Sequence, residues 1–597
     1  MSTPHERVES SYATIFRLAR TESKVYIVGF ILIFVTNVIE TAWVRATALA
    51  VEEVWRGSAT AATAGIIMGL ALVVFLFRCL NRNVTFLAGR RIERRLRTRI
   101  FRSAIGLSQD EMDKHRTGDL VSRIINDVSD IRLVLGSGFL QVTNNIIAYA
   151  VTIATMLALV PKLAIVAILP FLPLFWIAKK LTAATHERSK RSQEALGALS
   201  SAVEETVGGI EVIKSHTAEP WQLERFCAAN ERHYDAELAR TRPESVFVGL
   251  MGSVVWIGIA AILLAGGALL PLALDHPESS GGIGDLATFI FLFARLVWPT
   301  VALGWIMNVI QRGLAASTRV EMFLTETVQG DVTRAAGIDP RKTSLIELRQ
   351  VSFTYSTRSR PSVTDLDIII KPGEWVGIVG PTASGKTTLA RLIAGLRAPT
   401  VGATMIGGLP VAELDDDSRR GLVHLATQVP TLFSMSIAAN LRLSDGPDLS
   451  DVRLRAVIDD VAFLEDLDAM KDGLATEIGE RGLLLSGGQR QRLSLARAYL
   501  SSAEVLVLDD ILSAVDLRTE LAILEGIRRN RAGKTTIFIT HRLLLLSRLD
   551  RVIVMEDGRV TADGTLPEAM RDSTWLRATF EADKLTASLE SEDAVTA

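Results

Sequence analysis

The sequence predicts a multidomain protein in which an all-α membrane domain of six helices is followed by an α/β domain with a phosphate-binding loop. Three observations predict this class. The chain has 597 residues, too many for one domain. Its mean hydropathy is +0.28 although 22% of its residues are charged, as expected when a lipid-soluble half and a water-soluble half are averaged. Long apolar runs fill the first half, and a loop of small residues after a buried strand lies in the second.

The composition excludes several other classes of protein. With 48% hydrophobic residues and only two cysteines, Cys79 and Cys227, the chain is neither disordered nor a disulfide scaffold. The net charge of −2 gives no reason to expect a nucleic-acid partner. The first twenty residues are charged throughout and lack an apolar core, so they do not predict a cleaved signal peptide.

We expect five segments along the chain. A polar stretch with Gly and Pro between the two halves predicts a linker, and the polar, acidic end predicts a disordered tail. The expected boundaries are a cytoplasmic N-terminal segment at 1–22, a transmembrane domain at 23–326, the linker at 327–344, the α/β domain at 345–582 and the tail at 583–597.

Six apolar runs are read against the length of about 20 residues that a membrane-spanning helix needs. A large buried helical core is the alternative, but such long apolar runs are rare in soluble domains. The fourth run is short and contains Pro170 and Pro173, which leaves its ends poorly fixed. The runs are Val25–Ala50, Ala64–Leu87, Phe139–Val160, Leu163–Ala178, Val246–Leu274 and Leu286–Ile310.

Basic residues predict the orientation of these spans. The segments after the second and fourth spans are rich in Lys and Arg, as in Gly89–Arg102, whereas opposite loops such as Asp275–Asp285 are short and poor in both. By the positive-inside rule, the basic segments, the α/β domain and both termini are cytoplasmic. We therefore expect a multi-pass protein of the plasma (inner) membrane. The long basic connections keep a helical pattern, which predicts helices that continue below the membrane.

Five ionisable residues fall inside apolar runs: Glu40, Arg45, Arg78, Arg82 and Arg295. Charge at membrane depth is costly and tends to face a bundle interior or a water-filled cavity, so these residues are candidates for a translocation path. Two alternatives stay open: helices that extend beyond the bilayer place Arg78 and Arg82 in water, or the charges pair structurally. None of them identifies a substrate.

A phosphate-binding loop follows the apolar strand Trp375–Gly380 and precedes a helical pattern. Small residues let backbone N–H groups wrap around phosphates, Lys386 reaches the β and γ phosphates, and the Thr387 hydroxyl ligates Mg²⁺. The pattern predicts a nucleoside triphosphate and Mg²⁺ as ligands. Its residues are Gly380, Pro381, Thr382, Ala383, Ser384, Gly385, Lys386, Thr387 and Thr388.

Two further motifs surround this loop in the chain. A second apolar strand, Val505–Leu508, ends in Asp509, where ATPases with this loop place the acid that holds Mg²⁺ through water. Between the two strands lies the pentapeptide Leu485, Ser486, Gly487, Gly488 and Gln489. This LSGGQ sequence is the signature of ATP-binding-cassette (ABC) ATPases, and the neighbouring sequence resembles that family from the first span to about residue 580.

The resemblance implies roles for other residues of the α/β domain. Tyr355 matches the aromatic residue that stacks on adenine, and Gln428 matches the glutamine that senses Mg²⁺ and the membrane domain. His541 matches the histidine that contacts the γ-phosphate. Thr476–Gly482 resembles the loop that contacts cytoplasmic helices in exporters, and Ser513–Asp516 matches the loop that crosses between paired domains.

The membrane half carries its own resemblance to the multidrug-resistance-like half-transporters of this family. Thr117–Arg132 and Gly208–Phe226 look like the cytoplasmic loops of exporters with six spans per half. The resemblance implies short coupling helices near His115–Asp119 and Thr217–Trp221 that press on the ATPase domains. Trp298–Ser317 is similar to the sixth span.

The resemblance also implies that two chains meet, since each ATP in this family lies between the phosphate loop of one domain and the LSGGQ of a second. The γ-phosphate needs donors on both faces, and a helix N-terminus supplies them. One chain has one of each. ATP binding then closes the domains and turns the membrane helices, and hydrolysis resets them.

One residue departs from the family pattern. The family places a glutamate after Asp509 to polarise the attacking water, and this chain has Asp510. Aspartate is one methylene shorter, and a displacement of about 1 Å can cost on the order of a hundredfold in rate. We expect a heterodimer in which Asp510 lies in a slow ATP site and this chain's LSGGQ completes a fast one. The alternative is an active homodimer with an adapted pocket.

The resulting functional hypothesis is ATP-driven export of amphipathic compounds, drugs or lipids. Import through the same architecture, as in exporter-like siderophore importers, is an alternative with the same motifs. A nucleotide-gated channel or regulatory subunit is another, to which Asp510 gives some weight. A soluble cassette ATPase that acts on ribosomes or DNA is contradicted by the six apolar runs.

Overall fold

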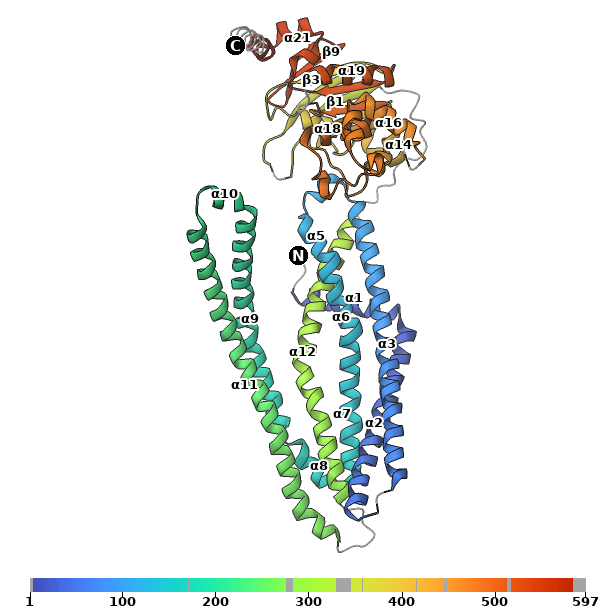
Figure 1. The fold of residues 1–597 in the computed structure, drawn as a ribbon, viewed down its shortest axis with the longest axis vertical. Coiled ribbons are helices and arrows are strands. Elements are labelled where there is room, and N and C mark those ends of the chain that lie inside the picture. Colours follow the sequence, from blue (N-terminus) through green and yellow to red (C-terminus); the bar gives the residue numbers. More distant parts are fainter. Residues whose placement is uncertain are drawn as a thin grey trace. The chain divides into compact units, whose positions relative to one another are not determined.

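The structure is a computed structural model that describes residues 4–58, 60–169, 171–274, 283–328, 345–356, 358–414, 416–444, 446, 448–512 and 517–582 (Figure 1). The chain divides into two compact units. One is helical and takes in Met1–Ile105 and Thr117–Val328, and the other contains the strands and takes in Gly106–Arg116 and Gln329–Ala597. Residues 329–344 of the expected linker and the whole expected tail lie outside the described residues, so these boundaries stay predictions.

Long helices form the first unit. Among the residues that were described, four helical segments are long and apolar enough to cross a membrane: Ser23–Trp55, Ala61–Ile105, Thr117–Leu159 and Gly284–Thr325. Helix α3 (Ala61–Ile105) has 45 residues and is therefore about 68 Å long, more than twice the roughly 30 Å of a bilayer core. This length agrees with the expectation of helices that continue beyond the membrane.

Helix α2 (Ser23–Trp55) packs against α3, α7 (Phe139–Leu159) and α12 (Ile283–Val328) in a bundle (Figure 1). Helix α1 (Pro4–Arg20) packs on α12. The helix that leads into α7 contains two π-turns, at Arg123–Asp127 and Val134–Gly138. Its remaining turns are α5 (Thr117–Ser122) and α6 (Val128–Leu133).

The fourth and fifth expected spans belong to a second group of helices. The fourth apolar run is divided between α8 (Pro161–Ile168) and α9 (Phe171–Gly208), and position 170 between them is a proline, which cannot donate a helical hydrogen bond. Helices α9 and α11 (Glu219–Leu274) lie side by side, joined through α10 (Ile210–Ser215) (Figure 1).

Short helical elements lie close to both ranges in which coupling helices are expected, His115–Asp119 and Thr217–Trp221. Near the first range, α4 (Gln109–Met112) begins with a capping box between Ser108 and Glu111, and α5 begins at Thr117. Near the second range, α10 ends at Ser215 and α11 begins at Glu219, and Thr217 between them has φ of 51°. The role of these segments as coupling helices stays a prediction.

The second unit contains two sheets (Figure 1). A four-stranded antiparallel sheet has the order β2-β1-β4-β5, and a six-stranded sheet has the order β10-β9-β3-β8-β7-β6. Strands β9, β3, β8, β7 and β6 are parallel, and β10 is antiparallel to β9. The strands are β1 Ile346–Phe353, β2 Val363–Ile370, β3 Trp375–Val379, β4 Val401–Ile406, β5 Leu409–Pro410, β6 Val423–Ala426, β7 Val505–Asp509, β8 Thr535–Ile539, β9 Arg551–Glu556 and β10 Arg559–Gly564.

Helices on both sides bury these strands. One core cluster joins the two sheets to α13, and a second joins β7 and β8 to α15, α16, α18 and α19. Every residue of β3, β7 and β8 is buried, as expected of central parallel strands. The helices are α13 Lys386–Ile393, α14 Asp416–Leu422, α15 Ile437–Arg442, α16 Asp451–Asp460, α17 Leu464–Ala469, α18 Gly487–Tyr499, α19 Leu517–Asn530, α20 Leu543–Leu546 and α21 Leu566–Asp572, with single 3₁₀ turns at Val411–Glu413, Gly473–Ala475 and Glu480–Gly482.

Candidate functional site

The parallel sheet brings four of the predicted motifs to one edge. The phosphate loop follows β3, Gln428 follows β6, Asp509 ends β7 with Asp510 directly after it, and His541 follows β8. The register of the strands brings the ends of β3, β7 and β8 close together. Ile539 of β8 pairs with Ile378 of β3 on one side and with Asp509 of β7 on the other. The carboxyl ends of parallel strands are where α/β folds bind ligands.

Two glycines give the phosphate loop its path. Gly380 has φ of 151° and Gly385 has φ of 100°, a region that L side chains rarely adopt. A Cβ at Gly380 would lie 2.0 Å from the carbonyl oxygen of Met555, and one at Gly385 would lie 2.6 Å from that of Ser362. Backbone packing therefore requires glycine at these two positions of the loop.

Lys386 lies against the inside of this loop. Its Nζ donates hydrogen bonds to the carbonyl oxygens of Gly380 (2.8 Å) and Pro381 (2.7 Å). Burial lowers the pKa of Lys386, and the negative charges of Asp509 and Asp510 oppose that effect. The ammonium group is thus held between the loop and the two carboxylates, where it can meet phosphate oxygens.

The side chains of Asp509 and Thr387 are joined by a hydrogen bond beside the phosphate loop. Burial raises the pKa of Asp509, whereas a hydrogen bond with the Thr387 side chain lowers it. Carboxylate and hydroxyl oxygens are the ligands that Mg²⁺ prefers. This pair, next to the phosphate loop, therefore fits the magnesium site that the sequence predicts.

Gln428 and Asp510 contact each other next to Asp509. The Gln428 Nε2 donates to Asp510 Oδ2 at 3.2 Å. The Asp510 backbone N–H donates to the Ile539 carbonyl at 2.8 Å, and Asp510 has φ of 48°. Among non-glycine residues, Asn and Asp are enriched in this left-handed region, a local reason for aspartate that the sequence prediction missed. His541, after the neighbouring strand, is exposed.

Tyr355 reaches the same loop from the end of β1. Its hydroxyl lies 3.1 Å from Thr388 Oγ1 and 3.4 Å from Arg391 Nη1. The Arg397 guanidinium carbon lies 5.3 Å from the centre of the Tyr355 ring, within the range of a cation–π contact.

Arg397 was not predicted as a site residue. Its side chain is 4% exposed and forms ion pairs with Asp110 and Asp113, which belong to the Gly106–Arg116 segment of the same unit. The predicted adenine-binding tyrosine is therefore one side chain away from α4. A basic residue far along the chain carries no sequence signal for such a pairing.

The LSGGQ motif leads into the N-terminus of α18, where Leu485 is buried and Ser486 and Gly487 are exposed. Ser486 is the N-cap, and it exchanges capping-box hydrogen bonds with Gln489 at 3.2 Å and 2.8 Å. Gln489 Nε2 also donates to Asp466 Oδ1 at 2.8 Å. Among the described residues, no hydrogen bond or ion pair joins Ser486–Gln489 to the phosphate loop.

The resemblance to the family singles out two further loops, Thr476–Gly482 and Ser513–Asp516. The loop Thr476–Gly482 is anchored beside α15, where the Ile437 backbone N–H donates to the Thr476 carbonyl at 3.1 Å. Ser513–Asp516 lies outside the described residues, so its predicted role in crossing between domains stays a prediction.

These observations define a class of protein: a multi-pass membrane protein with a phosphate-loop ATPase domain. Comparisons with known proteins agree with this class. Residues 26–300 match the model of the ABC transporter transmembrane region, and residues 363–513 match the ABC transporter model.

The similar proteins cover nearly the whole chain. The probable multidrug resistance ABC transporter ATP-binding/permease protein YheI of Bacillus subtilis is 32% identical over 94% of this chain and 95% of its own. The multidrug resistance-like ATP-binding protein MdlA of Escherichia coli is 32% identical over 87% of each chain. The structure of a bacterial Atm1-family ABC exporter with ATP bound has a TM-score of 0.73 at 22% identity, over 94% of this chain and 98% of that one.

The chain belongs to the ABC transporter family. It is a membrane-embedded ATPase that couples ATP hydrolysis to transport. The predicted fold class, a helical membrane domain followed by an α/β ATPase domain of the exporter type, is confirmed. The roles predicted for individual residues and for Asp510 stay predictions.

Proposed function

We propose that the chain is one half of an exporter for amphipathic small molecules, drugs or lipids in the plasma (inner) membrane, with the ATPase domain and both termini cytoplasmic. The observation that carries this proposal is the similarity, over 94% of the chain, to a protein named as a probable multidrug resistance transporter. The basic segments after the second and fourth predicted spans support the orientation.

In the proposed ATP site, the backbone of Gly380–Thr388 wraps the phosphates and Lys386 binds the β and γ phosphates. Thr387 and Asp509 hold Mg²⁺, with Gln428 beside them. Three facts support this assignment: the positive φ values of the loop glycines, the buried Lys386 ammonium and the hydrogen bond between Thr387 and Asp509.

The reacting end of the site involves three other side chains. Asp510 orients the attacking water, His541 contacts the γ-phosphate, and Tyr355 stacks on adenine. The hydrogen bond from Gln428 to Asp510 supports a shared position beside the γ-phosphate. Mg²⁺ neutralises developing charge on the phosphates when it is bound.

Two chains complete each ATP site. The exposed, capped N-terminus of α18, with Ser486, Gly487, Gly488 and Gln489, supplies N–H donors to an ATP held by the phosphate loop of a partner. We favour a second, different half-transporter as the partner. Asp510 then lies in a slow site, and the intact LSGGQ of this chain completes the fast site.

The first test is steady-state ATP turnover of the full chain alone in nanodiscs, with Lys386→Ala as the blank. Turnover at the level of the blank in folded, ATP-binding protein is expected for one half of a heterodimer. Turnover clearly above the blank would establish a working homodimer. Lys371→Ala, a change at an exposed lysine outside the site, should leave the result unchanged.

Direction of transport is tested in inside-out vesicles that contain the assembled transporter. ATP-dependent accumulation of a labelled amphipathic compound inside the vesicles is the expected result. ATP-dependent loss from preloaded vesicles would indicate an importer. A complex that shows neither transport nor substrate-stimulated ATP turnover would favour the regulatory-subunit alternative.

A further inference from the structure

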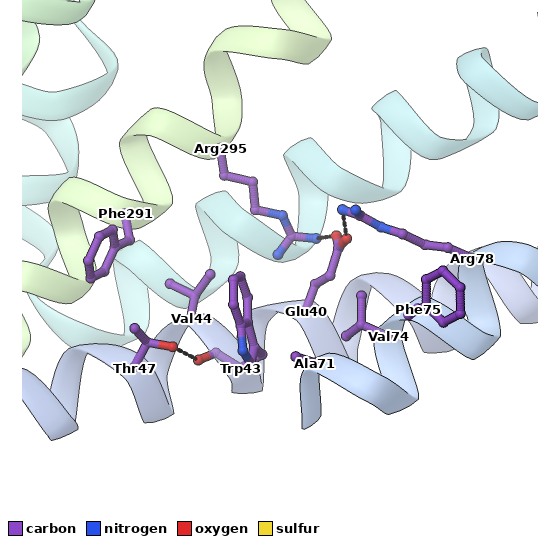
Figure 2. Close-up of a pocket in the computed structure, with 10 residues that line it drawn as sticks. All are labelled: Glu40, Trp43, Val44, Thr47, Ala71, Val74, Phe75, Arg78, Phe291 and Arg295. Carbon is purple, nitrogen blue, oxygen red and sulfur yellow. Dashed lines mark hydrogen bonds and ion pairs between the residues drawn. The ribbon is translucent and has the colours of Figure 1, made fainter. Parts of the chain in front are cut away.

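The helical unit contains a pocket of about 410 Å³ between α2, α3 and α12 (Figure 2). Its wall is mainly apolar and includes the aromatic rings of Trp43, Phe75 and Phe291. Three charged residues from the three helices meet in it: Glu40, Arg78 and Arg295. All three had been singled out from the sequence as charges inside apolar runs.

The Glu40 carboxylate lies between the two arginines, with Arg295 on one side and Arg78 on the other (Figure 2). Arg295 Nη2 lies 2.8 Å from Glu40 Oε2, and Arg78 Nη2 pairs with Glu40 Oε1. One carboxylate thus serves two guanidinium groups. The cluster keeps one positive charge in excess.

The two arginines differ in how firmly they are held. Arg295 also donates to Thr41 Oγ1 at 2.6 Å and to Asn37 Oδ1 at 2.8 Å, and its side chain is 14% exposed. The Arg78 side chain is 67% exposed, and within the described part of the chain Glu40 is its one acceptor. Arg295 therefore fixes Glu40, and Arg78 has donors to spare.

Arg78 lies in a helix long and apolar enough to cross a membrane, and charge at membrane depth is costly without a polar or anionic neighbour. The planar guanidinium is suited to bidentate recognition of carboxylate and phosphate groups.

We infer that this pocket binds an anionic amphiphile, whose acidic group is held by Arg78 while its apolar body lies on Trp43, Phe75 and Phe291. Without a ligand, Glu40 is the counter-ion of Arg78. When the ligand binds, its acidic group takes the place of Glu40 on Arg78, and Glu40 stays paired with Arg295. This inference rests on the proposed function and adds to it the charge of the transported compound. No covalent step is involved.

The test uses the full chain in phosphatidylcholine nanodiscs and a bromine-labelled long-chain fatty acid, dibromostearate, with its neutral methyl ester for comparison. Bromine quenches tryptophan fluorescence on contact, and subtraction of the signal of Trp43→Phe isolates the pocket. We expect the acid to bind about tenfold more tightly than the ester, because a charge-assisted bond to arginine is lost in the ester.

Variants of the charged residues should then separate the roles. Arg78→Gln should weaken binding of the acid about tenfold and leave the ester unchanged. Arg82→Gln is the matched control: Arg82 is an exposed arginine one turn along α3 whose guanidinium lies over Phe86 rather than in the pocket. Glu40→Gln should tighten binding of the acid several-fold, because it removes the competing carboxylate.

Equal affinities for acid and ester, or equal losses in Arg78→Gln and Arg82→Gln, would overturn the inference. Export of a neutral amphiphile that the acid does not inhibit would overturn it while leaving the proposed export function intact. Acid binding at Arg78 without ATP-dependent transport of any amphiphile would instead overturn the export function. The same titration in phosphatidylglycerol nanodiscs distinguishes the source of the acidic group. Weaker binding of dibromostearate there would show that an anionic bilayer lipid occupies the pocket. Unchanged binding would show that the ligand is a free acid.

Discussion

The phosphate loop and the membrane pocket both place basic side chains beside carboxylates, but they are assembled in different ways. The loop is one contiguous stretch, and two glycines at positive φ give it its shape. The pocket joins side chains from three helices, with Glu40 separated by 38 residues from Arg78 and by 255 from Arg295. A site shaped by the backbone leaves a motif in the sequence, whereas a site shaped by side-chain pairing leaves only isolated residues.

The largest expected effect on stability is in the pocket and distinguishes its two arginines. Arg295→Gln removes the partner that fixes a nearly buried Glu40, and loss of one member of a buried pair costs about 3 kcal/mol. Arg78→Gln removes the exposed partner and should cost less than about 1 kcal/mol. Thermal unfolding midpoints of both variants in identical nanodiscs measure the difference. Equal shifts would contradict the distinction between a fixed and an available arginine.

The importance of backbone shape in the loop is tested by a matched pair of glycines. Gly380→Ala introduces a side chain at positive φ against the Met555 carbonyl, whereas Gly408, with φ of 83°, has open space where a Cβ would lie. We expect Gly408→Ala to cost about 1 kcal/mol from backbone strain alone. Gly380→Ala should cost about 2 to 3 kcal/mol and abolish binding of a fluorescent ATP analogue. Similar unfolding midpoints and normal binding would disprove the steric argument.

A half-buried histidine provides a pH test confined to the α/β unit. Burial, with Arg497 and Arg531 nearby, lowers the pKa of His424 on β6 to about 4, against about 6.5 in an unfolded chain. The unfolded state binds more protons between these values, so stability is lost as the pH falls from about 6.5 towards 4. At pH 5 the loss is about 2 kcal/mol. His424→Gln should reduce the difference between the thermal unfolding midpoints at pH 7 and pH 5. An unchanged difference would show that protonation of His424 does not cause the loss of stability.

The smallest expected effect concerns Asp510. Asp510→Glu should raise ATP turnover of the assembled transporter several-fold if the short side chain limits a slow site. The gain is moderated because glutamate is less suited than aspartate to φ of 48°. Asp510→Asn, which suits the same backbone but lacks the carboxylate, should lower turnover at this site. An unchanged rate in Asp510→Glu would exclude Asp510 as the limiting residue.

The sequence predicted the features that are local. The phosphate loop, LSGGQ and the strand that ends in Asp509 each consist of neighbouring residues, and the structure brings Lys386, Thr387, Asp509, Asp510 and Gln428 together at one sheet edge. The sequence indicated only that the ends of the fourth apolar run were poorly fixed, and it did not predict that this run is divided between α8 and α9.

The features that the sequence did not predict depend on distant partners or on backbone detail. The ion pairs of Arg397 with Asp110 and Asp113 join positions 287 and 284 residues apart, and no periodic pattern encodes such a pairing. The left-handed conformation of Asp510 follows from its place at the end of β7, where its N–H reaches Ile539. Likewise, the sequence indicated Glu40, Arg78 and Arg295 as unusual but could not show that they meet.

The Arg397 ion pairs have a practical consequence for biochemistry on isolated fragments. A soluble fragment that begins at residue 345 would retain every nucleotide motif but lose Asp110 and Asp113. Arg397, with a side chain only 4% exposed, would then keep its charge without either carboxylate, directly beside the Tyr355 ring. If Tyr355 stacks on adenine as predicted, affinities for adenine nucleotides measured on such a fragment would reflect altered surroundings of Tyr355, so titrations should be carried out on the full chain.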